Sequence, residues 1–289
     1  MNSTVFLLVL GSAFCHAGWN FAARKVSGNF IVLWISLWIG CLFLLPIALG
    51  VLFKLGFTQS VQTSGIPYMI TTGCIHAVYF TLLGISYQHG EISMVYPIAR
   101  GTGVGLTAIF ASLIFAEKIS LLGTFSIALI SLSILSMGFS SSNSPSKTKP
   151  LIAALCLGIT ISAYSLVDKM GVVYVHPVIY IWFLFFITAI VLTPFIVWQY
   201  HDAIISTVKT HFKFALVIGI GSIITYLMVL VAFTVGPVSY IVAVREFAVV
   251  FGAVAGLVFL KEKCSILKIV SIIGITIGII CIKAVSFLK

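Results

Sequence analysis

Two arginines lie inside segments that are otherwise apolar and long enough to cross a bilayer. Arg100 and Arg245 are each the seventh or eighth residue of their segment, which places them at equivalent depth. Because an arginine at the bilayer centre costs between about 2.5 and about 10 kcal/mol or more, each guanidinium should face a cavity or a partner. Two guanidiniums can hold one carboxylate or phosphonate by bidentate hydrogen bonds, which predicts an anion site. The alternative is that both arginines are structural and pair with Glu246 or Asp168.

Aromatic and polar residues with helical spacing accompany the arginines. Tyr96 precedes Arg100 by four residues and therefore falls on the same helix face. The stretch HAGWN places His16, Trp19 and Asn20 on one face of the first apolar segment. The predicted substrate-binding residues are Arg100, Arg245, Tyr96, Trp19, Asn20 and Tyr164.

A few titratable side chains other than the bases also fall within apolar segments. Glu246, Asp168 and His16 are each candidates to carry a coupling proton, because acids and histidines inside a membrane often serve as proton relays. Two alternatives stay open. Asp168 precedes Lys169 near the end of its segment, which equally favours an interfacial ion pair. A single histidine in a membrane segment is more often a packed, hydrogen-bonded residue.

Signatures of enzymatic or cofactor chemistry are missing from the sequence. It contains no His and Glu set with metal-ligand spacing and no nucleophile elbow, and its cysteines lack paired spacing. The glycine run GTGVG resembles a nucleotide-binding loop, but it lies within an apolar segment rather than after a soluble strand. The sequence therefore predicts a protein that is not an enzyme and has no cofactor or metal.

The composition is that of an integral membrane protein. Of 289 residues, 61% are hydrophobic and 8% are charged, whereas about a quarter of a soluble domain is charged. Ten apolar segments, each sufficient to cross about 30 Å of hydrocarbon, span 4–22, 30–53, 67–86, 93–115, 119–138, 151–167, 176–198, 213–234, 238–260 and 266–286. The net charge of +10 is scattered over loops, which argues against nucleic-acid binding. The expected partners are the bilayer and a small-molecule substrate, and the expected state is a monomer or homodimer.

The two halves of the chain repeat. A shift of 145 residues aligns VREFAVVFGAVAGLVFLKEKCS with ARGTGVGLTAIFASLIFAEKIS without a gap, so that Arg245 matches Arg100. Upstream the shift is 146, so the first half has gained one residue near Tyr96 and Pro97, where we expect a kink or bulge. Because five helices is an odd number, tandem copies would enter the membrane from opposite sides, as in many secondary transporters. The predicted organisation is a five-helix repeat at 1–140, a linker at 141–150 and a second five-helix repeat at 151–289.

With these residues assembled, the chain resembles the EamA group of the drug/metabolite transporter superfamily over essentially its whole length. The resemblance rests on the two halves, each with an acidic-basic pair after its fourth helix (AEKIS and KEKCS), and on HAGWN, YPIARGTG, AYSLVDKMG and VREFAVVFGA. It implies an all-α fold of ten transmembrane helices as two inverted repeats, a central cavity between the halves, and alternating access. It also implies export of amino acids or other small metabolites, often with proton coupling.

The predicted function is secondary transport of a small anionic or zwitterionic metabolite, such as an amino acid, an organic acid or a phosphonate, by proton-coupled export across the bacterial inner membrane. The alternatives are a non-transporting membrane subunit or sensor, and an enzyme acting on an anionic lipid head group. The orientation is open. Lys and Arg near helix ends are fewer on the side of the termini, which places the termini outside, whereas the resemblance implies cytoplasmic termini.

Overall fold

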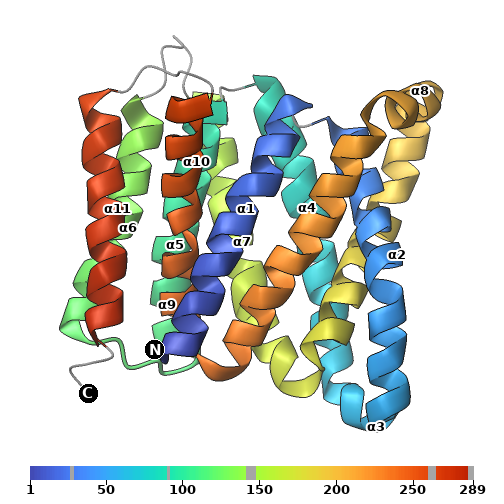
Figure 1. The fold of residues 1–289 in the computed structure, drawn as a ribbon, viewed down its shortest axis with the longest axis horizontal. Coiled ribbons are helices and arrows are strands. Elements are labelled where there is room, and N and C mark those ends of the chain that lie inside the picture. Colours follow the sequence, from blue (N-terminus) through green and yellow to red (C-terminus); the bar gives the residue numbers. More distant parts are fainter. Residues whose placement is uncertain (27–28, 90–91, 141–147, 260–264, 286–289) are drawn as a thin grey trace.

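The computed structural model describes residues 1–26, 29–89, 92–140, 148–259 and 265–285, and within these ranges the chain is a bundle of helices (Figure 1). The elements are α1 (Ser3–Lys25), α2 (Phe30–Leu55), α3 (Phe57–Ser60), the short 3₁₀ helix η1 (Thr63–Gly65), α4 (Ile66–His89), α5 (Ile92–Ile114), α6 (Leu121–Ser140), α7 (Thr148–Tyr174), α8 (Pro177–Val235), α9 (Val238–Arg245), α10 (Phe247–Phe259) and α11 (Ile266–Val285). Most of the expected linker, and the predicted pair Glu262 and Lys263, lie outside the described residues.

Helix α8 contains two of the predicted membrane segments. Within the described residues, nine helical segments are long and apolar enough to cross a membrane, and α8 is the longest at 59 residues. A straight helix of that length would measure about 90 Å, roughly three times the hydrocarbon thickness. The chain therefore turns back at Tyr200, whose torsions of φ −132° and ψ 15° are not helical (Figure 1). The predicted segments 176–198 and 213–234 leave residues 199–212 between them. This stretch holds no Gly or Pro, and apart from Tyr200 it is helical.

The predicted segment 238–260 is interrupted at its two adjacent charged residues, Arg245 and Glu246. Glu246 ends α9 with torsions of φ −67° and ψ −6°, and its amide donates to the carbonyls of Ala243 and Val244. This tightening of the last turn separates α9 from α10. The sequence also predicted a kink or bulge near Pro97 in the first half. There α5 continues as a helix from Ile92 to Ile114 with the proline inside it.

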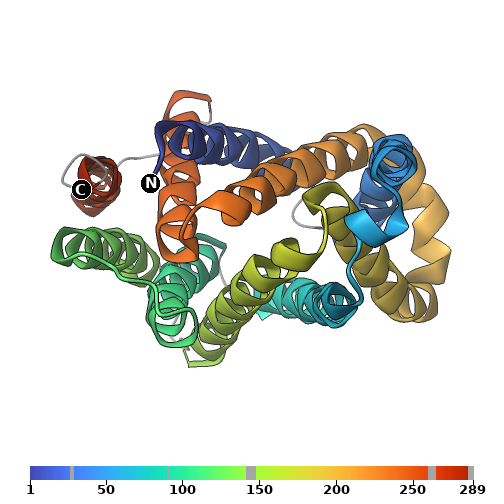
Figure 2. The same ribbon diagram turned by 90° about the horizontal axis from the view of Figure 1, so that it is seen from below.

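The two halves of the chain interleave. Helix α5 packs on α7, α1 on α8, α2 on α8, and α6 on α11, so each contact joins a first-half element to a second-half element. Viewed from below, α6 and α11 lie at one side of the bundle and α2 at the other, beside α8 (Figure 2). Helices α1, α5, α9 and α10 lie between these two sides (Figure 2). The centre of the bundle is therefore built from both halves.

Glycines bring α5 close to its neighbours and so fix the helix that carries Arg100. A Cβ on Gly158 of α7 would lie 2.6 Å from the Cβ of Thr102, and one on Gly103 would lie 2.6 Å from Ile161 Cγ2. The backbones of α5 and α7 thus pack directly, as small residues allow in membrane helices. With that face of α5 against α7, the Arg100 side chain extends toward the junction of α9 and α10.

Candidate functional site

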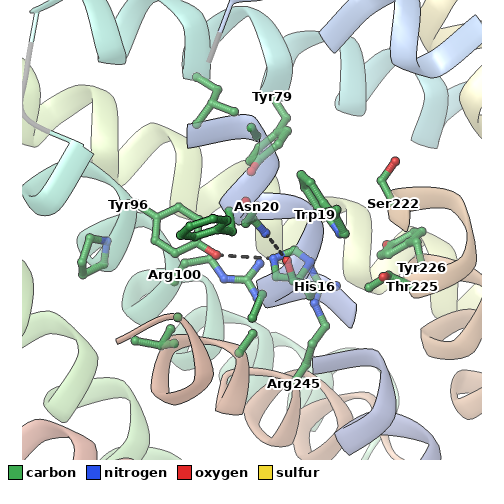
Figure 3. A pocket seen from close by; sticks show the side chains of 18 of the residues that line it. His16, Trp19, Asn20, Tyr79, Tyr96, Arg100, Ser222, Thr225, Tyr226 and Arg245 are labelled. Atoms are coloured by element: carbon green, nitrogen blue, oxygen red, sulfur yellow. Dashed lines mark hydrogen bonds between the residues drawn. The ribbon is translucent and has the colours of Figure 1, made fainter. Parts of the chain in front are cut away.

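A cavity of about 650 Å³ lies between helices of both halves (Figure 3). Its wall reaches Ala23 near the end of α1 and Lys268 near the start of α11. In the opposite direction the wall ends at residues well inside their helices or at the α9–α10 junction, such as Tyr164 and Arg245. The cavity therefore extends toward one end of the bundle, the upper end in Figure 1. A volume of this size suits a small molecule.

All of the predicted substrate-binding residues lie in the wall of this cavity: Arg100, Arg245, Tyr96, Trp19, Asn20 and Tyr164. Of the predicted proton carriers, one lies in the wall and two lie behind it. His16 lies in the wall, its Nε2 is 3.4 Å from the Tyr96 hydroxyl, and its carbonyl accepts a hydrogen bond from Asn20 at 2.8 Å (Figure 3). Glu246 and Asp168 are buried behind the wall, with exposed fractions of 1% and 0%.

Arg100 forms a buried ion pair with Glu246. Its Nε donates to Oε2 at 2.9 Å and its Nη2 donates to Oε1 at 2.5 Å, so the pairing is bidentate. The two residues are 146 positions apart and join α5 to the α9–α10 junction. For Arg100, this is the interhelical pairing that the sequence left open as the alternative to anion binding.

Arg245 differs from Arg100 because it has no such acid. Among the described residues, no carboxylate lies within 4.0 Å of its nitrogens, and its buried Nε has no hydrogen-bond partner. Its guanidinium carbon is 5.4 Å from the centre of the Tyr226 ring, which is within cation–π range. Two other buried polar atoms in the wall, Trp19 Nε1 and Thr225 Oγ1, also have no partner. Because an unpaired buried donor costs about 1–3 kcal/mol, these atoms are suited to bind polar groups of a ligand.

Asp168 is held by tyrosine hydroxyls rather than by the neighbouring lysine. Tyr180 Oη donates to Asp168 Oδ1 at 2.8 Å, and Tyr226 donates to Oδ2. Lys169 instead donates to the carbonyls of Phe233 and Gly236, at 2.5 and 2.8 Å. The Asp168–Lys169 ion pair that the sequence left open is not formed. Tyr226 connects the acid to the cavity, since its ring lies in the wall.

Several wall residues were not among the predicted set. Tyr226, Thr225 and Tyr79 line the cavity, as does His76, whose ring centre lies 4.3 Å from that of Tyr164. The adjacent Thr225 and Tyr226 are polar residues in an apolar segment, and that was the available signal. Their direction around α8 depends on packing that the sequence alone does not specify.

A charged clamp formed by Glu117 and Lys169 holds the α8–α9 connection at the end of the bundle away from the cavity. The Glu117 carboxylate accepts hydrogen bonds from the amides of Val238 and Ser239 at 2.7 and 3.3 Å, and from the Ser239 hydroxyl at 2.6 Å. It therefore caps the start of α9, where free amides favour an anion. Lys169 binds the carbonyls at the end of α8. The two residues therefore bind both ends of the α8–α9 connection.

The membrane-crossing helices and the cavity between them define a multi-pass membrane protein with an internal site of small-molecule size. Residues 148–284 match the EamA-like transporter family. The chain is 37% identical over 75 residues to the multidrug resistance protein EbrB of Bacillus subtilis (strain 168), covering 26% of this chain and 59% of that relative. It is 34% identical over 94 residues to EbrB of Bacillus atrophaeus, covering 32% of this chain and 74% of that relative. The chain belongs to the EamA-like transporter family of the drug/metabolite transporter superfamily, and it is an integral, multi-pass membrane protein.

The fold has a close counterpart among solved structures. A crystal structure of a protein matches 99% of this chain and 99% of its own, with a TM-score of 0.79 and 13% sequence identity. At that identity the likeness concerns the fold alone.

Proposed function

We propose that the protein is a secondary transporter of a small anionic or zwitterionic metabolite, with Arg245 as the group that binds the anion. The observation that carries this proposal is the buried guanidinium in the cavity wall, which has no acid within 4.0 Å among the described residues. A positive charge in a low-dielectric site needs a counter-charge, and a carboxylate or phosphonate supplies it with bidentate geometry. Trp19, Tyr96 and Tyr164 would contact the rest of the substrate, and Asn20 would add a polar contact.

The arrangement of the chain supports an inverted repeat with alternating access. Helix α1 begins at the lower end of the bundle in Figure 1, and the odd number of crossings in the first half brings α7 in from the upper end. The repeats would thus be 1–140 and 151–289 with the linker 141–150 between them, and the cavity lies between them. In this proposal the cavity is accessible from one side while the Glu117–Lys169 clamp closes the other, and transport exchanges the two.

Proton-coupled export would use Asp168 as the coupling acid. Both oxygens of Glu246 bind Arg100, so protonating Glu246 would break an ion pair, whereas Asp168 accepts hydrogen bonds from the neutral hydroxyls of Tyr180 and Tyr226. Tyr226 connects Asp168 to the cavity, and His16 in the wall is a second candidate. The setting would be the bacterial inner membrane, with the protein as a monomer or homodimer.

Replacement of Asp168 by asparagine is expected to uncouple transport. The variant keeps the shape of the side chain but has no exchangeable carboxyl proton, so flux driven by a pH gradient should be lost while exchange of labelled for unlabelled substrate continues. Proteoliposomes measure both quantities. Asp202→Asn is the matched control, because Asp202 is 91% exposed and lies far along α8 from the cavity. Retained gradient-driven flux in Asp168→Asn would remove this residue from the coupling role.

The proposed function is tested by a thermal-shift screen of the purified protein with amino acids, organic acids and phosphonates. A ligand that binds the folded state raises the melting temperature by mass action. Hits are then tested for flux in proteoliposomes. We expect an anionic compound both to stabilise the protein and to be transported. Binding without flux would favour a sensor or a non-transporting subunit, and turnover of an anionic lipid would favour an enzyme. Stabilisation only by cationic compounds, of the kind that multidrug transport would suggest, would contradict the anion site.

A further inference from the structure

The two guanidiniums in the cavity wall differ in whether a neighbouring acid balances their charge. Arg100 and Arg245 occupy equivalent positions in the repeat and both line the cavity. Arg100 places two N–H groups on Glu246, which is 1% exposed and lies outside the wall. Arg245 has no such acid among the described residues. Glu246 therefore neutralises the charge of Arg100, whereas the charge of Arg245 is available to a ligand.

The number of available charges limits what the cavity can hold. Within a low-dielectric site, each charge of a bound ligand needs a counter-charge, and a charge without one carries a large desolvation penalty. Arg245 supplies one positive charge in the deep part of the cavity. Lys268 also belongs to the wall, but it lies near the start of α11 at the open end. A ligand with one negative charge matches the deep part of the cavity, and a second negative charge there would be unbalanced.

We propose that Glu246 is a specificity-determining residue that restricts the substrate to a single negative charge, as in a monocarboxylate. This inference rests on the proposed function of the cavity as an anion site. Removal of the Glu246 charge would release Arg100, whose side chain already lines the cavity, and would give two guanidiniums to one ligand. The substrate preference should then move from monoanions to dianions. Glu246 thereby acts on the substrate through Arg100.

The test compares two probes of equal chain length, butyrate and succinate, on the full-length protein. Binding is measured as the concentration dependence of the thermal shift, which gives the ratio of the two affinities. We expect the unchanged protein to bind butyrate more tightly than succinate. In Glu246→Gln the ratio should move toward succinate by about tenfold or more, because close charge pairs contribute strongly at buried sites. The double variant Arg100→Gln with Glu246→Gln again has one available guanidinium, so its ratio should return to that of the unchanged protein.

The outcomes distinguish a failure of this inference from a failure of the proposed anion site on which it rests. If Arg245→Gln binds butyrate as well as the unchanged protein does, the anion site itself is wrong. If Arg245→Gln loses binding but the ratio is unchanged in Glu246→Gln, only the role of Glu246 is wrong. Should Glu246→Gln fail to fold, the comparison is made with Glu246→Met, which has a similar volume and no charge: a ratio that moves toward succinate supports the inference, and an unchanged ratio contradicts it.

Discussion

Replacement of Arg245 by glutamine is expected to weaken binding of the transported anion by about tenfold to a hundredfold. Hydrogen bonds to a charged group contribute about 1.5–3 kcal/mol, and each 1.4 kcal/mol is about tenfold in affinity. The substitution keeps a polar, though shorter, side chain and removes the charge from a position that is 5% exposed. The dissociation constant from thermal shifts and the transport rate in proteoliposomes should both report the loss. Arg245→Lys should recover only part of it, because an ammonium lacks the planar fork.

The control for this result is a cation that lies away from the cavity. Lys209 is exposed in the connecting part of α8, and Lys209→Gln removes the same charge from the chain. We expect this variant to bind and transport as the unchanged protein does. Equal losses in both variants would mean that net charge, rather than the cavity, determines binding. Unchanged binding in Arg245→Gln would exclude Arg245 as the anion ligand.

Replacement of Arg100 alone by methionine is expected to destabilise the protein by about 3–5 kcal/mol. This is the usual cost of removing one partner of a buried ion pair, because the remaining charge is left without compensation. Arg100 and Glu246 are 3% and 1% exposed, so water offers the orphaned carboxylate little relief. The measurement is the melting temperature of the purified protein in detergent, followed by loss of its helical circular dichroism signal.

The double variant Arg100→Met with Glu246→Met provides the matched control. Apolar residues of similar volume often replace a buried ion pair at little or no cost, so we expect most of the lost stability to return. The two changes should therefore be strongly non-additive, as expected for residues in contact. Additive losses, or a melting temperature of Arg100→Met equal to that of the unchanged protein, would show that the pair contributes little to stability.

The sequence alone determined the class of the protein and the depth of its polar residues. Apolar segments of about 20 residues require helices, because a backbone in lipid must satisfy its own hydrogen bonds. The same cost of exposing charge to lipid indicated that Arg100 and Arg245 point inward, and both lie in the wall of the cavity. The helical spacing of His16, Trp19 and Asn20 placed them on one face, and all of them line the cavity.

Only the tertiary structure decided which of these residues pair. The Arg100–Glu246 contact joins residues 146 positions apart, and the sequence offered Glu246 and Asp168 as equal partners for either arginine. The choice depends on the direct packing of α5 on α7 and on the interruption of the helix at Glu246, which turns the acid toward α5. Likewise, Asp168 binds Tyr180 and Tyr226 rather than Lys169 because α8 folds back beside α7. The depth of a residue in the membrane follows from the composition of its own helix. Its interaction partner depends on how helices that are distant in the sequence rotate against one another.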